Sequence, residues 1–161
     1  MTWSVTIAIG GQATHEAAVA VLDAAADQGL LVHQTDEYAD EVRNEDAGAI
    51  VFDDLVRIGD GTLGFYAPVH ESDRFVEVEA ECRRQGLPYV STVDGDEEAD
   101  GFTRWWIPGM EDVRQVDSNQ SGEAVIRLSE LEAAHADGTV ARLIEDRTIP
   151  TIPPLEMKPG R

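Results

Sequence analysis

The sequence predicts an α+β fold: a ferredoxin-like β-α-β-β-α-β sandwich, with an antiparallel sheet and helices on one face, followed by a C-terminal β/α extension. Stretches with apolar residues at period two alternate with stretches of helical period. The first strand–helix segment also overlays on a second one, with Ala18-Val19 on Phe75-Val76 and Gln28-Gly29-Leu30 on Gln85-Gly86-Leu87. Two such units joined by a hairpin give a ferredoxin-like sandwich.

The first unit begins with a strand at 3–11 that ends in two glycines. A helix follows at 14–29, with Thr14 as N-cap and a glycine at its end. Its buried stripe is predicted to consist of Ala18, Val21, Leu22 and Ala25. Residues 30–35 form a short strand or the entry to a loop.

The second unit completes a double β-α-β core over residues 1–94. Residues 36–48 are polar and predict a frayed helix or an acidic loop. The stretches 49–58 and 62–69 flank Gly-Asp-Gly and predict a hairpin. A helix at 71–86 and a strand at 87–93 close the core.

Residues 95–148 are predicted to add an acidic loop, a tryptophan-containing strand at 102–109 and a C-terminal helix packed on the same domain. Ser129 and Glu132 form the Ser-x-x-Glu pattern of a capping box, which places a helix start at Ser129. The end of the chain, 149–161, is rich in proline and is predicted to be an extended tail.

Charge gives the strongest functional signal. The 161 residues carry 32 Asp and Glu against 12 Lys and Arg, a net charge of −20. Such a charge costs folding energy through self-repulsion and repels phosphates. It therefore argues against nucleic acid as a direct partner and favours a basic protein, and it leaves self-association open.

Composition narrows the setting further. A 42% apolar content is enough for a real core, and no run of 18 apolar residues exists, so no membrane span is expected. Cys82 is the only cysteine, which excludes an internal disulfide. These features predict a cytoplasmic protein.

Two acidic blocks are the predicted partner-binding surfaces. In an extended segment, residues two apart lie about 6.6 Å apart on one face, close to the spacing of successive phosphates on a nucleic-acid strand. Tryptophan and arginine are enriched at binding hot spots, so the Arg-Trp-Trp that follows one block would anchor it. The candidate residues are Asp94, Asp96, Glu97, Glu98, Asp100, Arg104 and Trp105 in one block, and Asp36, Glu37, Asp40 and Glu41 in the other.

The tryptophan strand has two faces. Phe102, Arg104 and Trp106 share one of them, which we expect to meet the core. Trp105 points the other way and is expected to be at least partly exposed beside the acids. The plainer interpretation is that the acidic run only solvates a loop next to a core strand.

No motif nominates catalytic, metal or cofactor chemistry. The histidines (His15, His33, His70 and His135) show no metal-ligand spacing, and Cys82 falls on a buried helical stripe. A calcium loop that began at Asp94 would need glycine and glutamate where the chain has Ala99 and Trp105. We therefore predict no catalytic residue, no metal and no cofactor.

These observations predict a non-enzymatic acidic binding protein that inhibits a nucleic-acid-binding partner by DNA or RNA mimicry. Phage and plasmid anti-defence proteins, such as anti-CRISPR or antirestriction proteins, are the class that fits this charge and size. One alternative is an ordinary enzyme or ligand-binding domain from a salt-adapted or high-GC organism, whose acidity is solvation. Another is an acidic antitoxin-like partner of one basic protein.

Overall fold

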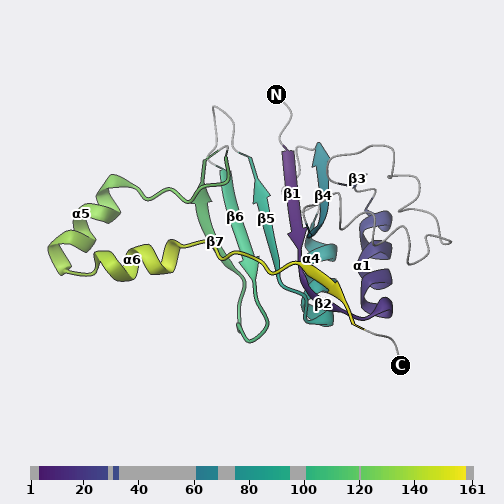
Figure 1. The fold of residues 1–161 in the computed structure, drawn as a ribbon. Helices are drawn as coiled ribbons and strands as arrows, with labels where there is room; N and C mark the ends of the chain where they lie inside the picture. The colour runs from purple at the N-terminus through teal and green to yellow at the C-terminus, as the bar shows by residue number, and fades with distance from the viewer. Residues whose placement is uncertain are drawn as a thin grey trace.

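The computed structural model describes residues 4–28, 31–32, 61–68, 75–94, 101–119 and 121–158 (Figure 1). Within them, six strands form one antiparallel sheet in the order β3-β4-β1-β5-β6-β7. These strands are β1 Ser4–Ile9, β3 Leu31–Val32, β4 Leu63–Pro68, β5 Tyr89–Val93, β6 Gly101–Trp106 and β7 Arg114–Ser118. A separate parallel pair joins β2 Gly11–Ala13 to β8 Leu155–Met157.

Four helices belong to the described residues: α1 His15–Asp27, α4 Val76–Gln85, α5 Leu128–Asp137 and α6 Val140–Arg147. Helices α1 and α4 cover one face of the sheet, whereas α5 and α6 project beyond β7 (Figure 1). The α+β class with an antiparallel sheet is therefore confirmed. The strand order of the whole sheet differs from the four-stranded sheet that we expected, because β6 and β7 extend it.

Several predicted segments lie outside the described residues. They include the polar stretch 36–48 and the first hairpin strand at 49–58. The second hairpin strand is observed as β4 and pairs with β1. No described helix is both long enough and apolar enough to cross a membrane.

Local sequence signals account for the start of α1. The Oγ1 of Thr14 accepts a hydrogen bond from the backbone N–H of Ala17 at 3.1 Å, which is the geometry of an N-cap. The predicted stripe is buried, and it packs against the core strands: Ala18, Val21, Leu22 and Ala25. Both predictions for this helix are confirmed.

The second helix repeats the burial of the first. At α4 the buried residues are Phe75, Val78, Glu79 and Cys82, which match Ala18, Val21, Leu22 and Ala25 under the sequence overlay. Gly86 ends α4 in the left-handed region at φ 71°, and the N–H of Leu87 donates to the carbonyl of Cys82 at 2.8 Å. This is a Schellman-type end, which favours glycine. The echo between the two units therefore has a structural counterpart.

Both tryptophans of β6 are buried. Trp106 pairs with Tyr89 of β5 and faces the helices, while Trp105 pairs with Val90 and faces the opposite way. Trp106 is 9% exposed and belongs to the main core, as expected. Trp105 is only 3% exposed, so the exposure that we expected for it is wrong.

The second face of the sheet, on which Trp105 lies, is crossed by a later segment of the chain (Figure 1). After α6 the chain crosses that face toward β2 (Figure 1). The N–H of Gly11 is shared between the carbonyls of Pro153 at 3.3 Å and Pro154 at 3.2 Å, which fixes the crossing segment to the start of β2. A Cβ on Gly10 would lie 1.9 Å from the Pro153 oxygen, so only glycine permits this approach. The proline-rich stretch is thus part of the folded body.

The pair α5 and α6 forms a helical hairpin, which we call the arm. Gly138 lies in the left-handed region at φ 71° and ends α5, and its neighbour Thr139 is the N-cap of α6. The helix start that we predicted at Ser129 is wrong, because α5 begins at Leu128 and its N-cap is Arg127. Ser129 lies inside the first turn, where it does not cap the helix.

Candidate functional site

The candidate site is a groove between α1 and α4, which pack side by side on one face of the sheet. The groove has a volume of about 310 Å³. Four carboxylates and one arginine line it, together with small and amide side chains: Asp23, Asp27, Glu77, Glu81, Arg84, Ala20, Ala24 and Gln28. We call this the acidic groove.

The acidic groove is built from equivalent positions of the two units. Under the overlay of the two segments, Ala20 corresponds to Glu77, Ala24 to Glu81 and Asp27 to Arg84. The two related helices therefore turn the same positions toward each other. Acids occur on both sides of the contact.

Each helix carries its groove acids one turn apart. Asp23 and Asp27 stand at i,i+4 on α1, and Glu77 and Glu81 do so on α4. Like charges at this spacing destabilise a helix by about 0.2–0.5 kcal/mol per pair. Asp23, Asp27 and Glu77 are exposed, so their charges face solvent within the groove.

Glu81 is held differently from the other three acids. Its carboxylate accepts a hydrogen bond from Gln85 Nε2 at 2.8 Å and pairs with Arg84. The Glu81 side chain is 12% exposed, whereas that of Arg84 is 69% exposed. One arginine therefore offsets one of the four charges, and the groove keeps a negative balance.

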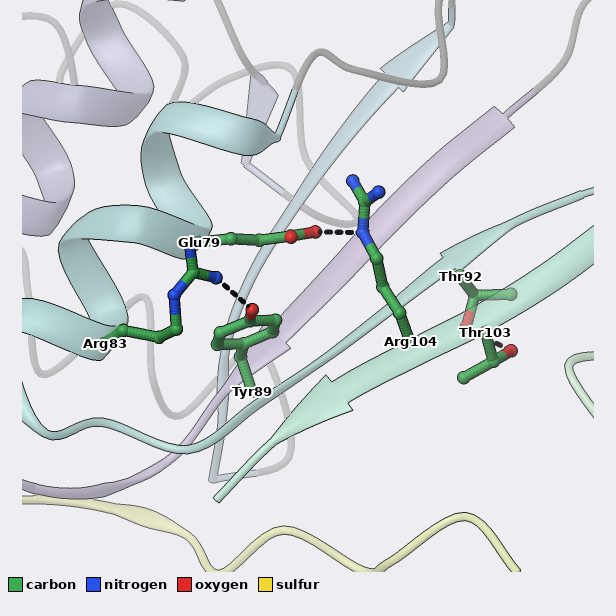
Figure 2. Close-up of polar contacts among 6 residues, drawn as sticks. All are labelled: Glu79, Arg83, Tyr89, Thr92, Thr103 and Arg104. Atoms are coloured by element: carbon green, nitrogen blue, oxygen red, sulfur yellow. Dashed lines mark hydrogen bonds and ion pairs between the residues drawn. The ribbon is translucent and has the colours of Figure 1, made fainter. Parts of the chain in front are cut away.

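A second polar cluster lies beneath the groove, between α4 and the sheet. Figure 2 shows Glu79 of α4 reaching Arg104 of β6, whose Nε lies 2.7 Å from the Glu79 Oε1. The two side chains are 5% and 16% exposed respectively. The Arg104 guanidinium also lies 5.7 Å from the centre of the Phe102 ring, within range of a cation–π contact.

The surroundings of Glu79 shift the pKa of its carboxyl group. Burial raises the pKa of Glu79 above its ordinary value, and the charge of Arg104 offsets part of that rise. Ser91 lies close enough to favour the charged carboxylate, yet its buried Oγ makes no hydrogen bond of normal geometry to any described residue. Glu79 occupies the position of Leu22 in the first unit, so this ion pair replaces an apolar core contact.

Tyr89 and Cys82 complete the cluster. Arg83 Nη1 donates to the Tyr89 hydroxyl at 2.5 Å (Figure 2). Burial, with the negative charge of Glu79, raises the pKa of Tyr89 to about 12. Burial and the same charge also raise the pKa of the Cys82 thiol. A thiol of this kind stays protonated at neutral pH and is a poor nucleophile, so the cluster supports the fold rather than covalent chemistry.

The predicted partner-binding residues divide into three groups. Asp94 is half-buried directly after β5. Arg104 and Trp105 lie inward on β6, the first paired with Glu79 and the second buried at 3% exposure on the opposite face. The remaining acids lie outside the described residues: Asp36, Glu37, Asp40, Glu41, Asp96, Glu97, Glu98 and Asp100.

The acids of the groove were not among the predicted site residues. The signal was present, because Asp23/Asp27 and Glu77/Glu81 stand one helical turn apart in the sequence. Among the residues that the structure describes, no group of three or more His, Cys, Asp or Glu side chains is arranged to hold a metal ion.

No protein-family model, curated protein or solved structure matches this chain. Its function must therefore be argued from its own charge and geometry.

Proposed function

We propose that this protein is a non-enzymatic acidic binding protein that inhibits a nucleic-acid-binding partner by imitating the phosphate charge of DNA or RNA. The observation that carries the proposal is the acidic groove, where two helices bring pairs of carboxylates to one surface. It lies in a chain whose net charge is −20.

The electrostatic repulsion among the groove acids supports a binding role. Each like-charge pair opposes the helix that carries it, and the net charge opposes the compact state. A partner with a basic surface would relieve this repulsion on binding, and long-range attraction would speed the encounter. Residues one helical turn apart have Cβ atoms about 5–6 Å apart, near the spacing of successive phosphates on one strand.

The biological class that fits is that of phage and plasmid anti-defence proteins, such as anti-CRISPR and antirestriction proteins. The analogy rests on charge and size. Such a protein would act in the cytoplasm, where a chain with a single buried cysteine needs no disulfide.

We also infer that the part of the fold built from β1, α1, β3, β4, α4 and β5 is a ferredoxin-like unit. Its support is the local strand order β3-β4-β1-β5, with all three adjacent pairs antiparallel. In this interpretation β6 and β7 are an addition at one edge, and the acidic groove is the seam between the two helices of the unit.

The test begins with capture of a partner from a candidate host lysate, followed by binding measurements on the purified partner. Two charge-matched variants are compared: Asp23→Lys/Asp27→Lys in the groove, and Glu111→Lys/Asp112→Lys in the loop before β7. All four acids are exposed, and each variant changes the net charge by the same amount. We expect the groove variant to slow association at least about 10-fold and the loop variant to have a smaller effect.

Competition decides between mimicry and other acidic binding. A mimic and a DNA or RNA oligonucleotide should exclude each other from the partner, and affinity should fall as salt rises. A partner that binds both at once would contradict the proposal, as would equal effects of the two variants. A chain that folds only near 1 M salt, where the Debye length is about 3 Å, would instead favour salt adaptation.

A further inference from the structure

The arm exposes more apolar surface than any other described part of the chain. Of the five large hydrophobic side chains that are exposed, four lie at its root or on its helices: Val125, Leu128, Leu131 and Ile144. Leu128 is 69% and Ile144 54% exposed. The fifth, Val76, lies on α4.

Helix α6 is amphipathic without a buried residue. Val140, Leu143 and Ile144 stand at i, i+3 and i+4 on one face, with Arg142, Glu145 and Asp146 elsewhere. No residue of α6 is buried, and only Ala134 is buried on α5. Val140 and Leu143 are half-buried and Leu143 lines the groove against α5, whereas Ile144 stays 54% exposed.

The arm is also too small to be stable through its own contacts. Helix α5 has 10 residues and α6 has 8, whereas isolated helices below about 12–15 residues are marginal in water. Arg147 links the two helices through an ion pair with Glu130 at 3.5 Å, which is partly exposed. A surface ion pair adds at most about 1 kcal/mol, so the arm needs a further packing surface.

The distribution of charge along the chain indicates which partner packs on the apolar surface of the arm. Residues 127–147 contain three arginines and five carboxylates, a net charge of −2, which leaves −18 of the total −20 for the rest of the chain. A basic partner would be drawn to the acidic body rather than to the arm. Two copies of this chain repel each other everywhere, and the arm is where that repulsion is weak and apolar area is available.

The arm carries both projecting apolar side chains and a recess. It offers exposed leucines, and it contains a groove of about 440 Å³ between α5 and α6, lined by Ala133, Ala134 and Leu143 with charged residues around them. A twofold interface requires projections and recesses on the same surface of one chain. Two helical hairpins that pack together also make a four-helix bundle.

We propose that the arm docks on the arm of a second copy of this chain, so that α5 and α6 of two chains form a four-helix bundle with a twofold axis. Leu128, Leu131 and Ile144 supply its core, and the acidic bodies lie outward on either side. This inference does not depend on the proposed function.

Sedimentation equilibrium tests the proposal over about 1–200 µM protein. The wild type is expected as a dimer of twice 17.5 kDa. Ile144→Glu should weaken dimerisation at least about 30-fold, which corresponds to a hot spot of about 2 kcal/mol. Val76→Glu is the matched control, because it places the same charge at a 45% exposed apolar residue outside the arm, and it should leave the dimer unchanged.

Two further measurements separate dimer loss from misfolding and from a charge-driven contact. The near-UV circular dichroism of the buried Trp105 and Trp106 should be the same in all variants, and Ile144→Ala provides a milder change in case Ile144→Glu does not fold. Salt near 0.5 M should strengthen the dimer, since it screens the repulsion between the bodies. A wild type that stays monomeric at all concentrations and salts would overturn the proposal, and so would a dimer that Ile144→Glu and Ile144→Ala leave intact.

Discussion

Replacing each tryptophan of β6 by alanine tests whether both faces of the sheet are covered. Trp105 and Trp106 are adjacent but point to opposite faces, and they are 3% and 9% exposed. A tryptophan buries about 150–250 Å², which at about 25 cal/mol per Å² gives an upper estimate of about 4–6 kcal/mol. Measured changes of this kind cost about 3–5 kcal/mol.

The two variants should differ by one hydrogen bond. Trp106 Nε1 donates to the carbonyl of Met110 at 3.1 Å, and a normal hydrogen bond contributes about 1 kcal/mol. We therefore expect Trp105→Ala to lower the free energy of unfolding by about 3–5 kcal/mol and Trp106→Ala by about 1 kcal/mol more. Trp106→Phe keeps most of the ring and should recover most of the loss.

Urea unfolding followed by far-UV circular dichroism measures these values without relying on the tryptophan signal. All variants must be compared at one protein concentration, because self-association would shift the midpoint. Val76→Ala is the surface control and should cost under about 1 kcal/mol. If Trp105→Ala costs no more than this control, the second face is open and the crossing segment does not protect it.

Three other outcomes are expected. Arg104→Met should lower the free energy of unfolding by about 3–5 kcal/mol, because it leaves Glu79 buried without its partner. In urea melts, adding Glu79→Leu to this variant should restore much of the loss. A double variant whose loss of stability equals the sum of the two single losses would contradict this. Because the pKa of Glu79 is raised above 4.5, the folded state holds its proton longer, so its contribution to stability falls as pH rises from about 4.5 through the folded-state pKa and is constant above it. Glu79→Gln should remove that part of the slope in melts from pH 4 to 8, and parallel slopes would refute the assignment. Gly10→Ala should lower the free energy of unfolding by more than about 3 kcal/mol, above the roughly 1–3 kcal/mol that is usual for overpacking, because its Cβ meets the Pro153 carbonyl. It should also make the crossing segment sensitive to protease. The control is Gly138→Ala, whose Cβ meets no atom within 4 Å and which should cost only about 1–2 kcal/mol.

The elements that the sequence predicted correctly are those specified by neighbouring residues. The cap at Thr14 and the stripe from Ala18 to Ala25 depend on contacts within one or two helical turns. The echo between the two units reached further along the chain, because the two helices bury equivalent positions and belong to the same core. The strands predicted at 87–93 and 102–109 likewise correspond to β5 and β6.

What the sequence did not yield is the cover on the second face. Alternation tells which residues share a face, but it does not tell which distant segment crosses that face, here the stretch after α6 that runs toward β2 (Figure 1). One signal was nevertheless present. Trp105, Trp106 and Ile107 form a continuous apolar run, and such runs are typical of strands buried on both faces.

The candidate site was missed for a similar reason. The acidic loops attracted attention because their charges are consecutive, whereas the groove acids are spread over two ordinary amphipathic helices. Arg104 was predicted to contact a partner because it follows an acidic block and arginine is enriched at hot spots. In the structure it pairs with Glu79, which lies 25 positions away on another element. A charged residue at an inward position of a core strand requires a buried counter-charge, but local pattern does not say which acid supplies it.

The separation of charge along the chain connects the proposed dimer with the proposed binding of a basic partner. Each of the two can still be tested without the other. The arm carries −2 and the rest carries −18, so contacts between copies and contacts with a basic partner would use different surfaces. A dimer joined at the arms would carry two acidic grooves. A partner with two basic sites, such as a dimeric or tandem nucleic-acid-binding protein, would then be held at both sites, and the second contact would form at a raised effective concentration. Ile144→Glu would therefore weaken binding to such a partner without altering the groove. The charge reversal at Asp23 and Asp27 would weaken each single contact and leave the dimer intact.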